Sequence, residues 1–296
     1  MPDVPALQPR PAIDVVVPFA GPMHQLRALR ERLGLLALVA GDTLTIVDNR
    51  PPGADPFEGA LPARERQSSY YARNRGAANG SNSWIEFLDA DVEPPPDLLE
   101  RLFADPPDER TAVLAGGVVD EPQDDGSRQP PATRFAMLSA SMSQSNTLLP
   151  GPWAYAQTAN CAVRRAAFED VGGFRDDLRS GGDADLCFRL RAAGWELEAR
   201  DEAAVIHRSR RSMRKLLRQR ARHGSGAAWL QRHYPGASPR ASSWAGLIKW
   251  TLTSFGAAAL ARLRGREDDA LVRFVEPLWM WAFELGRLFP NEVRER

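Results

Sequence analysis

Short apolar runs rich in β-branched residues recur through the first 120 residues, and each is too brief to be a helix. Between the first two runs, leucines recur at helical spacing over residues 26–36. Short apolar runs bounded by glycine or proline indicate buried strands. Strands that alternate with helices predict a mostly parallel, Rossmann-like sheet with helices on both faces. The sequence therefore predicts an α/β fold, with its first strands at residues 13–19, 43–49, 84–92 and 111–119.

Weaker signals predict further elements in both halves of the chain. Glycine and proline mark most of their boundaries, and the polar stretch 120–132 is expected to be a loop. The expected strands lie near 64–68, 153–163 and 195–207, and the expected helices near 72–81, 97–104, 165–171 and 184–193.

Charge and cysteine content narrow the class of protein. The 38 lysines and arginines balance the 38 aspartates and glutamates, so net charge gives no reason to expect a nucleic-acid binder. Cys161 and Cys187 cannot form a disulfide framework and lack CxxC spacing, which favours a reducing compartment. Residues 1–12 form a proline-rich lead that we expect to be disordered and that lacks the features of a secretory signal. We therefore expect a cytoplasmic location.

The character of the chain changes near residue 242. The apolar stretch 245–261 contains Lys249 and, at seventeen residues, is shorter than the ~20 that a membrane-spanning helix needs. The stretch 274–289 places polar and apolar residues on different sides of a helix. A buried core helix is expected there, with an interfacial membrane helix and a dimer surface as alternatives.

Carboxylates stand at the ends of two predicted strands. Asp48 ends the strand 43–49, and Asp89 and Asp91 follow the apolar part of the strand 84–92. In open α/β sheets ligands bind beyond the carboxyl ends of the strands. Two carboxylates held close together favour a divalent cation, which shares its oxygen ligands with substrate phosphates. Asp89 and Asp91 therefore predict a metal–diphosphate site, with a solvated turn as the alternative; for Asp48, ligand binding and an Asx turn stay open.

Asp183 follows two glycines at the predicted start of a helix. The positive end of the helix dipole favours an ionised carboxylate, as a general base requires, and a helix N-cap is the alternative. Asp185 is expected to point elsewhere, toward Arg189. His207 ends the predicted strand 195–207, where an imidazole can complete the coordination of a metal, although a lone histidine is more often an ordinary polar residue.

A basic run follows His207. Between residues 208 and 222 the chain carries eight lysine and arginine side chains and no acid. A diphosphate, an anionic membrane surface and nucleic acid are the partners that such a run can serve. Leu216 and Leu217 interrupt the run, as expected for a helix with one side packed against the protein. The alternative is that the run is simply the solvated face of a surface helix.

The order of these features resembles that of family 2 glycosyltransferases with a GT-A fold. From about residue 13 to 226, the matching segments are VVVPF, IVDN, ARNRGAANGS, FLDADV, TANCAVRRAAFEDVGGF, GGDADLCFRL and VIHRSRRS. Co-linear matches over this length are more specific than a lone Asp-x-Asp motif. The resemblance implies a catalytic domain over 13–226, with a nucleotide-binding half over 13–120 and an acceptor and base half over 121–226. A helical extension over 227–296 would follow.

The resemblance also implies roles for single residues. Asp183 matches the catalytic base, and Asp91, helped by His207, matches the ligand of a divalent cation, Mn²⁺ or Mg²⁺. The implied reaction moves one sugar from a nucleoside-diphosphate sugar to an acceptor hydroxyl group, with inversion. The implied substrate-binding residues are Asp48, at the base or ribose, and Asn74, Arg75, Asp89, Asn160 and Arg211.

The chain departs from the family pattern at two places. Gly182 and Asp183 stand where many members have Glu-Asp, so the base assignment rests on one carboxylate. The segment 219–223 resembles the Gln-x-x-Arg-Trp segment of processive polysaccharide synthases, but His223 replaces the tryptophan and no set of spanning helices follows. Both departures favour a single-transfer enzyme over a polymerising one.

Two other functions remain as alternatives. A sugar nucleotidyltransferase would share the sheet, the nucleotide and the metal, but it would need a glycine-rich basic loop where this chain has Gly21 alone. A non-catalytic adaptor would bind anionic surfaces through 208–222. The expected partners are thus a nucleotide-sugar donor and an acceptor of unknown identity, and no nucleic acid. The helices after 226 leave open a peripheral contact with the inner face of the cell membrane, or a homodimer.

Overall fold

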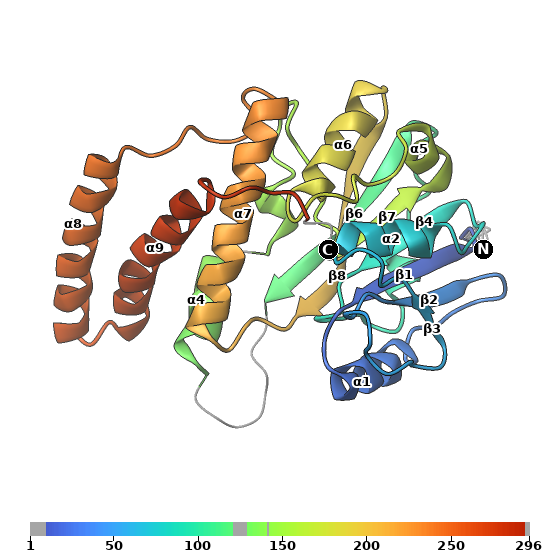
Figure 1. The fold of residues 1–296 in the computed structure, drawn as a ribbon, viewed down its shortest axis with the longest axis horizontal. Helices are drawn as coiled ribbons and strands as arrows, with labels where there is room; N and C mark the ends of the chain where they lie inside the picture. The colour runs from blue at the N-terminus through green and yellow to red at the C-terminus, as the bar shows by residue number, and fades with distance from the viewer. Residues whose placement is uncertain (1–9, 121–128, 141, 294–296) are drawn as a thin grey trace, which may run out of the picture.

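The computed structural model describes residues 10–120, 129–140 and 142–293. Within these residues the chain forms an eight-stranded sheet in the order β3-β2-β1-β4-β7-β6-β8-β5 (Figure 1). The pairs β1–β2, β1–β4, β2–β3 and β6–β8 are parallel, whereas β7 and β5 run antiparallel to their neighbours. The strands are β1 (Ile13–Phe19), β2 (Thr43–Asp48), β3 (Ala60–Pro62), β4 (Trp84–Leu88), β5 (Val92–Glu93), β6 (Thr111–Asp120), β7 (Asn160–Arg164) and β8 (Glu196–His207).

Helices cover both faces of this sheet, which confirms the predicted α/β fold. On one face, α1 and α3 bury Leu26, Leu29 and Leu98. On the other face, α2, α5 and α6 pack around Phe87 and Phe168. The helices are α1 (Met23–Leu33), α2 (Ser69–Ala77), α3 (Leu98–Leu102), α4 (Pro131–Ser139), α5 (Arg165–Asp170), α6 (Gly182–Ala192), α7 (Met213–His233), α8 (Trp244–Leu263) and α9 (Glu267–Gly286).

The segment after β2 departs from the sequence prediction. The sequence predicts a strand near 64–68, but the third strand is β3 and it ends at Pro62. Asn49 donates from Nδ2 to the carbonyl oxygens of Ala63 and Arg66, and so ties the following segment to the end of β2. Hydrogen bonds from side chains to the backbone compete with strand pairing, and an apolar pattern does not record them.

The start of one helix and the end of one strand differ from the sequence prediction, and local contacts explain both. The helix predicted over 72–81 is α2, which begins at Ser69 because the Oγ of Ser68 caps it. The strand predicted over 84–92 breaks after β4, so that residues 89–91 form a turn before β5. This turn carries the Asp-x-Asp segment beyond the carboxyl end of β4.

The structure describes ordered residues at both predicted limits of the catalytic domain. Of the predicted disordered lead over 1–12, residues 1–9 lie outside the described residues, and Arg10 forms ion pairs with Asp42 at 2.7 Å and Glu100 at 2.8 Å. At the other end, the boundary predicted at 226 falls within α7. Helix α7 therefore passes through the predicted boundary without a break.

Helices α7 and α9 cross at close range because each presents a glycine to the other. A Cβ on Gly224 would lie 1.9 Å from the carbonyl oxygen of Phe283, and a Cβ on Gly286 would lie 1.9 Å from that of Ala221. Any other residue at either position would push the two backbones apart. This contact fixes α9 beside α7. The sequence predicts a buried core helix over 274–289, but α9 is only partly buried, with Phe274 50% and Leu285 45% exposed.

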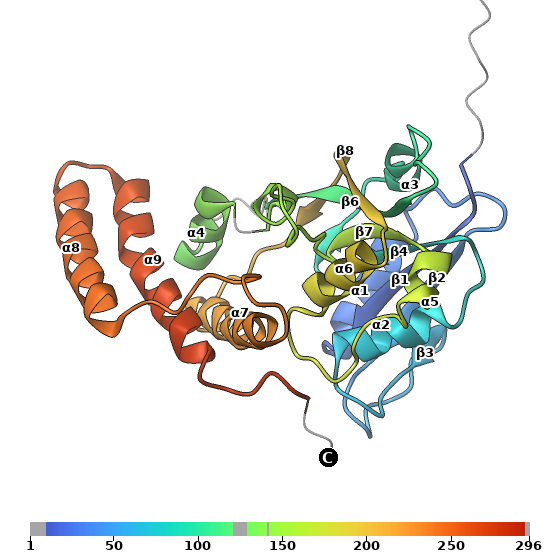
Figure 2. The same cartoon turned by 90° about the horizontal axis from the view of Figure 1, so that it is seen from above.

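Helix α8 packs against α9 and stands away from the sheet (Figure 2). Stacked rings join the two helices, Trp244 on Trp281 among them, with centroids 5.6 Å apart. The remaining surface of α8 leaves Ile248, Leu252 and Leu263 at least half exposed. Within the described parts of the chain, none of the helices combines the length and the hydropathy that crossing a membrane would require.

Candidate active site

A cleft of about 1920 Å³ opens at the carboxyl edge of the sheet. It is lined by residues 19–21 after β1, by the turn 89–91 after β4, by the start of α6, and by parts of α7 and α9. Three of the carboxylates singled out in the sequence, those of Asp89, Asp91 and Asp183, line it together. Because ligands bind at this edge in open α/β sheets, we take this cleft as the candidate active site.

Asp91 and His207 face each other, with Asp91 Oδ2 3.7 Å from His207 Nε2. Strand pairing brings them together, because β5 aligns Val92 with His207 and β6 aligns Asp120 with it from the other side. The Nδ1 of His207 lies 2.7 Å from Asp120 Oδ1. Burial opposes the charged imidazole, but the hydrogen bonds to Asp120 and Asp91 raise the pKa of His207 to about 10. For Asp91 burial is likewise outweighed, and the contact with His207 lowers its pKa.

The donor atoms at this point suit a divalent cation. Asp91 offers carboxylate oxygens, and His207 offers Nε2 to a cation that displaces the proton of the imidazolium ring. Asp120 fixes the other ring nitrogen, as an outer-shell partner usually does in metal sites. No group of three or more His, Cys, Asp or Glu side chains among the described residues forms a complete metal site. The protein would therefore supply part of a coordination shell, and phosphate or water oxygens the rest.

Arg73 binds Asp89, although the sequence patterns did not single it out. Its guanidinium forms an ion pair with Asp89 Oδ1 and lies over the rings of Tyr70 and Phe174, 5.7 and 6.0 Å from their centres. Burial raises the pKa of Asp89, and the charge of Arg73 opposes that rise. Tyr70, Arg73 and Ala77 are all buried and recur at helical spacing, which is the signal that could have found Arg73.

The structure does not bring Asn74 or Arg75 into the cleft. Asn74 donates from Nδ2 to the carbonyl oxygen of Phe174 at 2.8 Å and accepts from its N–H at 3.0 Å, so it joins α2 to the turn before α6. Arg75 is exposed and lines no described cavity. Successive residues of a helix point in different directions, so a helix that turns Arg73 toward the cleft turns the next two residues away.

Asp183 lies in the first turn of α6, with its side chain in the cleft. The N-cap alternative for Asp183 is wrong, because Gly181 occupies that position with φ at 81°. Burial raises the pKa of Asp183, and hydrogen bonds and the charge of Arg73 offset only part of the rise. Asp185 turns away and binds Arg189 at 2.7 Å, as the sequence predicted.

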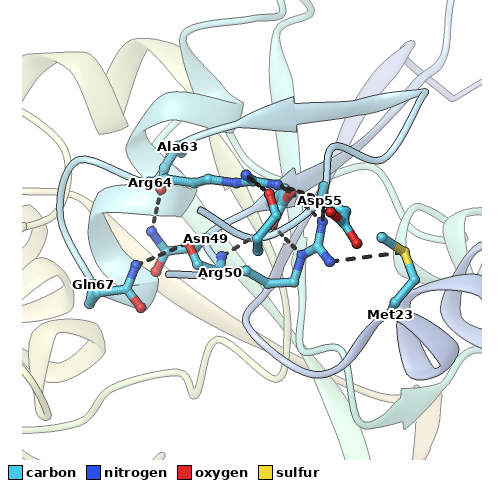
Figure 3. A network of polar contacts seen from close by, with 9 residues as sticks. Met23, Asn49, Arg50, Asp55, Ala63, Arg64 and Gln67 are labelled. Carbon is cyan, nitrogen blue, oxygen red and sulfur yellow. Dashed lines mark hydrogen bonds and ion pairs between the residues drawn. The ribbon is translucent and has the colours of Figure 1, made fainter. Parts of the chain in front are cut away.

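Asp48 ends β2 beside Phe19 of β1, but two arginines occupy its carboxylate. Figure 3 shows these arginines, Arg50 and Arg64, whose guanidinium groups converge at this point. Oδ1 accepts from the backbone N and the Nε of Arg50, and Oδ2 accepts from Arg50 Nη2 and from Arg64. These contacts outweigh burial and lower the pKa of Asp48 to about 2. The bond from the backbone N of Arg50 is the Asx turn that the sequence left open. Asp48 is 2% exposed and does not line the cleft, so its carboxylate is not positioned to contact a ligand directly.

Asn160 and Arg211 also lie outside the cleft. Asn160 is fully buried, and its Nδ2 donates to the carbonyl oxygens of Gly117 at 2.9 Å and Ala203 at 2.7 Å. It thereby holds β6 and β8 where their register shifts between Gly116 and Val118. Arg211 is exposed at the turn before α7.

Other arginines of the basic run do face the cleft. Arg210 and Arg222 line it, and they also line an adjoining cavity of about 1340 Å³. Arg208 lines it while paired with Glu93. His223 is at the cleft as well, and burial together with the neighbouring arginines lowers its pKa to about 3, so it is neutral near pH 7. Part of the basic run therefore faces a ligand-sized space and is not a purely solvated helix surface.

Comparison with protein families and curated proteins shows similarity over most of the chain. The family described as "Glycosyl transferase family group 2" matches residues 84–285. The chain is 31% identical over 283 residues to the pre-mycofactocin glycosyltransferase of Mycobacterium tuberculosis, covering 89% of this chain and 58% of that protein. It is 30% identical over 164 residues to glycosyltransferase AglE of Haloferax volcanii, covering 55% and 51%. The chain thus spans little more than half the length of these curated relatives.

Among solved structures, the chain is similar to the mannosyltransferase PcManGT from Pyrobaculum calidifontis, determined in complex with GDP-Man and Mn²⁺. The two structures superpose with a TM-score of 0.65 at 15% sequence identity, covering 95% of this chain and 88% of the other. At this identity the likeness establishes the fold and leaves the substrates of the present chain open.

Proposed function

Because the chain belongs to the glycosyl transferase family group 2 and has the GT-A fold, we propose that it transfers one sugar from a nucleotide-sugar donor to an acceptor hydroxyl group. The observation that carries this proposal is the single cleft shared by Asp89, Asp91 and Asp183. Transfer requires a site for the donor diphosphate and a base for the acceptor, close enough to act on the same bond. The geometry of the cleft supports both requirements.

Asp183 acts as the base in this proposal. The acceptor hydroxyl passes its proton to the carboxylate of Asp183 while its oxygen forms a bond to the anomeric carbon. The bond from that carbon to the diphosphate breaks, and the nucleoside diphosphate leaves with the electron pair. Attack from the face opposite the leaving group inverts the anomeric carbon. Burial supports this role, because a raised pKa makes Asp183 a stronger base than an exposed aspartate.

Asp91 and His207 would hold Mn²⁺ or Mg²⁺. When bound, the cation supplies Lewis-acid stabilisation of the charge that grows on the diphosphate. Asp120 contributes by keeping the Nε2 of His207 directed at Asp91. Arg73 contributes by placing its positive charge against Asp89 at the same edge of the cleft, which opposes the rise in pKa that burial causes. That a structural relative of the same fold was solved with Mn²⁺ agrees with this assignment.

The donor nucleotide is proposed to lie at the ends of β1 and β2. Residues 19–21 line the cleft there, and Asp48 stands beside Phe19 in the sheet register. Because the carboxylate of Asp48 already holds Arg50 and Arg64, it would act on the base or ribose through these guanidinium groups. Arg210 and Arg222 line the same cleft and offer positive charge to the diphosphate.

The alternative functions draw less support. A sugar nucleotidyltransferase would need a glycine-rich loop after β1, and α1 begins there after Gly21 and Pro22 with no side-chain cap. An adaptor that binds anionic surfaces would have no use for a buried carboxylate at the start of α6. Family membership and the cleft both favour a transferase.

We also propose that α8 contacts the surface of an anionic membrane. Its exposed side is apolar at Ile248, Leu252 and Leu263, and the segment 243–266 contains basic residues but no acid. An apolar helix face with only basic charges suits anionic headgroups. Cosedimentation with phosphatidylglycerol vesicles, but not phosphatidylcholine vesicles, is expected, and Leu252→Glu should abolish it. A dimer that Leu252→Glu dissociates, without vesicle binding, would instead identify a second copy as the partner.

Nucleotide binding tests the proposed transferase most directly. Calorimetry with uridine, guanosine and thymidine diphosphate sugars should detect one donor that binds more tightly with Mn²⁺ than without it. Asp91→Ala should remove the Mn²⁺-dependent part of the affinity and leave the melting temperature of the free protein close to that of the wild type, because the Asp91 side chain is 43% exposed. A protein that binds none of the donors, with or without metal, would overturn the proposal.

A further inference from the structure

Arg220 of α7 presents its guanidinium to two aromatic rings of α9. Its Cζ lies 3.7 Å from the ring centre of Trp279 and 4.3 Å from that of Phe283. Among the described residues Arg220 forms no ion pair, and its Nε is buried without a hydrogen-bond partner. Burial lowers the pKa of Arg220 to about 10, so the side chain still carries its charge near pH 7.

Glu284 of α9 interacts electrostatically with Arg220, but its carboxylate is already bound to other groups. Glu284 accepts hydrogen bonds at Oε1 from the backbone N and the Oγ of Ser242, at 3.1 and 3.0 Å. Its Oε2 lies 3.6 Å from the Nε of Arg287. A half-buried cation without an ion-pair partner is costly, and contact with aromatic faces returns only about 0.5–2 kcal/mol. The fold therefore holds guanidinium donors that a ligand or water must satisfy.

Arg220 lines the same cleft as Asp183, the proposed base. Tyr155 lines this cleft too and interacts electrostatically with both Asp183 and Arg220. We therefore place Arg220 on the acceptor side of the cleft. Aromatic rings of α9 form the wall against Arg220, and further apolar and aromatic side chains line the same cleft. Trp279 and Phe283 contact Arg220, and Leu149, Pro150, Trp153 and Met280 line the same cleft.

We propose that Arg220 binds an anionic group, a carboxylate or a phosphate, of an acceptor whose body is aromatic or apolar. The proposal rests on the transferase function, since Asp183 would meet the hydroxyl of the same molecule. Such an acceptor would pack its apolar surface against Trp279, Phe283 and their neighbours. Its anionic group would form an ion pair with the guanidinium of Arg220. A neutral sugar chain would leave that guanidinium without a partner.

Binding of small probes to the full chain tests this site. The probes are hydroxyphenylpropionate, its neutral amide and hydroxyphenylethyl phosphate, measured by calorimetry at fixed salt. We expect the wild type to bind at least one anionic probe about tenfold or more tightly than the amide, and the stronger of the two anions identifies the group that Arg220 takes. Equal affinity for all three probes, or no binding of any, would overturn the proposal.

Variants separate recognition from folding. Arg220→Gln should bind the anionic probes no better than the amide and should keep the thermal midpoint of the free protein, since it removes an unpaired charge. Arg220→Lys should retain much of the preference, which keeps the test valid if the glutamine variant folds poorly. Arg214→Gln removes an exposed arginine from the same helix that lines neither described cavity, and should change nothing. An undiminished preference in Arg220→Gln would assign the anion to another arginine and overturn the proposal.

The donor provides an independent readout. Arg220→Gln should bind nucleoside diphosphate and Mn²⁺ as the wild type does, because Arg220 is placed on the acceptor side. If the wild type binds no nucleotide but still prefers the anionic probes, the transferase function fails and the anion site stands. If nucleotide binding is normal and the probes show no preference, the acceptor assignment alone fails.

Discussion

The guanidinium of Arg73 is bound to the carboxylate of Asp89, which lies sixteen residues further along the chain at the end of β4. Arg73 is 3% exposed and is held over two aromatic rings, so the ion pair is fixed in the wall of the cleft. Its charge offsets part of the rise in pKa that burial causes at both Asp89 and Asp183. A single buried arginine thus acts on two of the carboxylates that the proposed reaction uses.

Replacement of Arg73 by methionine should reduce kcat/KM by about 100-fold or more, because Asp89 would lose its partner and the cleft a preorganised positive charge. Arg73→Lys keeps the charge but not the planar contact with the rings, and should lose less. The donor dissociation constant and the thermal midpoint are measured alongside. If the methionine variant folds and keeps the wild-type kcat/KM, the ion pair between Arg73 and Asp89 has a structural role only.

Asp183→Asn should abolish transfer, by about 1000-fold or more, while the donor binds nearly as tightly as before, because the amide cannot accept the acceptor proton. Asp177→Asn is a matched control, since Asp177 is exposed near the same helix and does not line the cleft. Nucleotide release with saturating donor and acceptor measures the rate. Transfer that survives in Asp183→Asn would remove Asp183 from the role of base.

The pH dependence of kcat/KM should show an acid limb from Asp183. The base works only when ionised, and burial raises the pKa of Asp183 above its ordinary value of 3.8. Activity should therefore decline, as the pH falls, at a higher pH than an exposed aspartate would give. The profile is recorded with the metal in excess and corrected for unfolding. A limb centred at or below 3.8 would contradict a desolvated base.

Glu86 should limit stability at neutral pH. It is fully buried in β4, both carboxylate oxygens lack a hydrogen-bond partner among the described residues, and burial raises its pKa well above 4.5. A carboxyl group with a raised folded-state pKa contributes stability below its unfolded pKa, and loses that contribution as the pH rises through the folded value. Glu86→Leu should therefore increase the free energy of unfolding at pH 7 by about 1–3 kcal/mol.

Urea titrations at several pH values measure this effect. The gain from Glu86→Leu should shrink toward acid pH, where the unfolded chain also protonates Glu86. A substitution that destabilises the protein equally at all pH values would show that the carboxyl group has a packing role that its lack of hydrogen-bond partners does not reveal.

Much of the fold follows from local pattern. The apolar runs at 13–19 and 43–49 are strands because their residues are β-branched and bounded by turn formers, and such signals need no distant partner. The locations of Asp89, Asp91 and Asp183 could be predicted for the same reason. A carboxylate that follows a strand or begins a helix takes its position from that strand or helix. The strand predicted near 64–68 fails because Asn49 binds the backbone there, and that contact is set by the tertiary structure.

The sequence by itself determined the alternating strands and helices and the positions of the acids along them, because periodicity and turn residues act over a few neighbours. Only the tertiary structure decided which side chains meet. Helix rotation turned Arg73 into the cleft and Asn74 out of it, and strand register set His207 between Asp91 and Asp120. Packing of α9 on α7 left Arg220 against aromatic rings without an acid. These contacts join residues far apart in the chain, and their energies depend on burial and orientation, which spacing along a sequence does not encode.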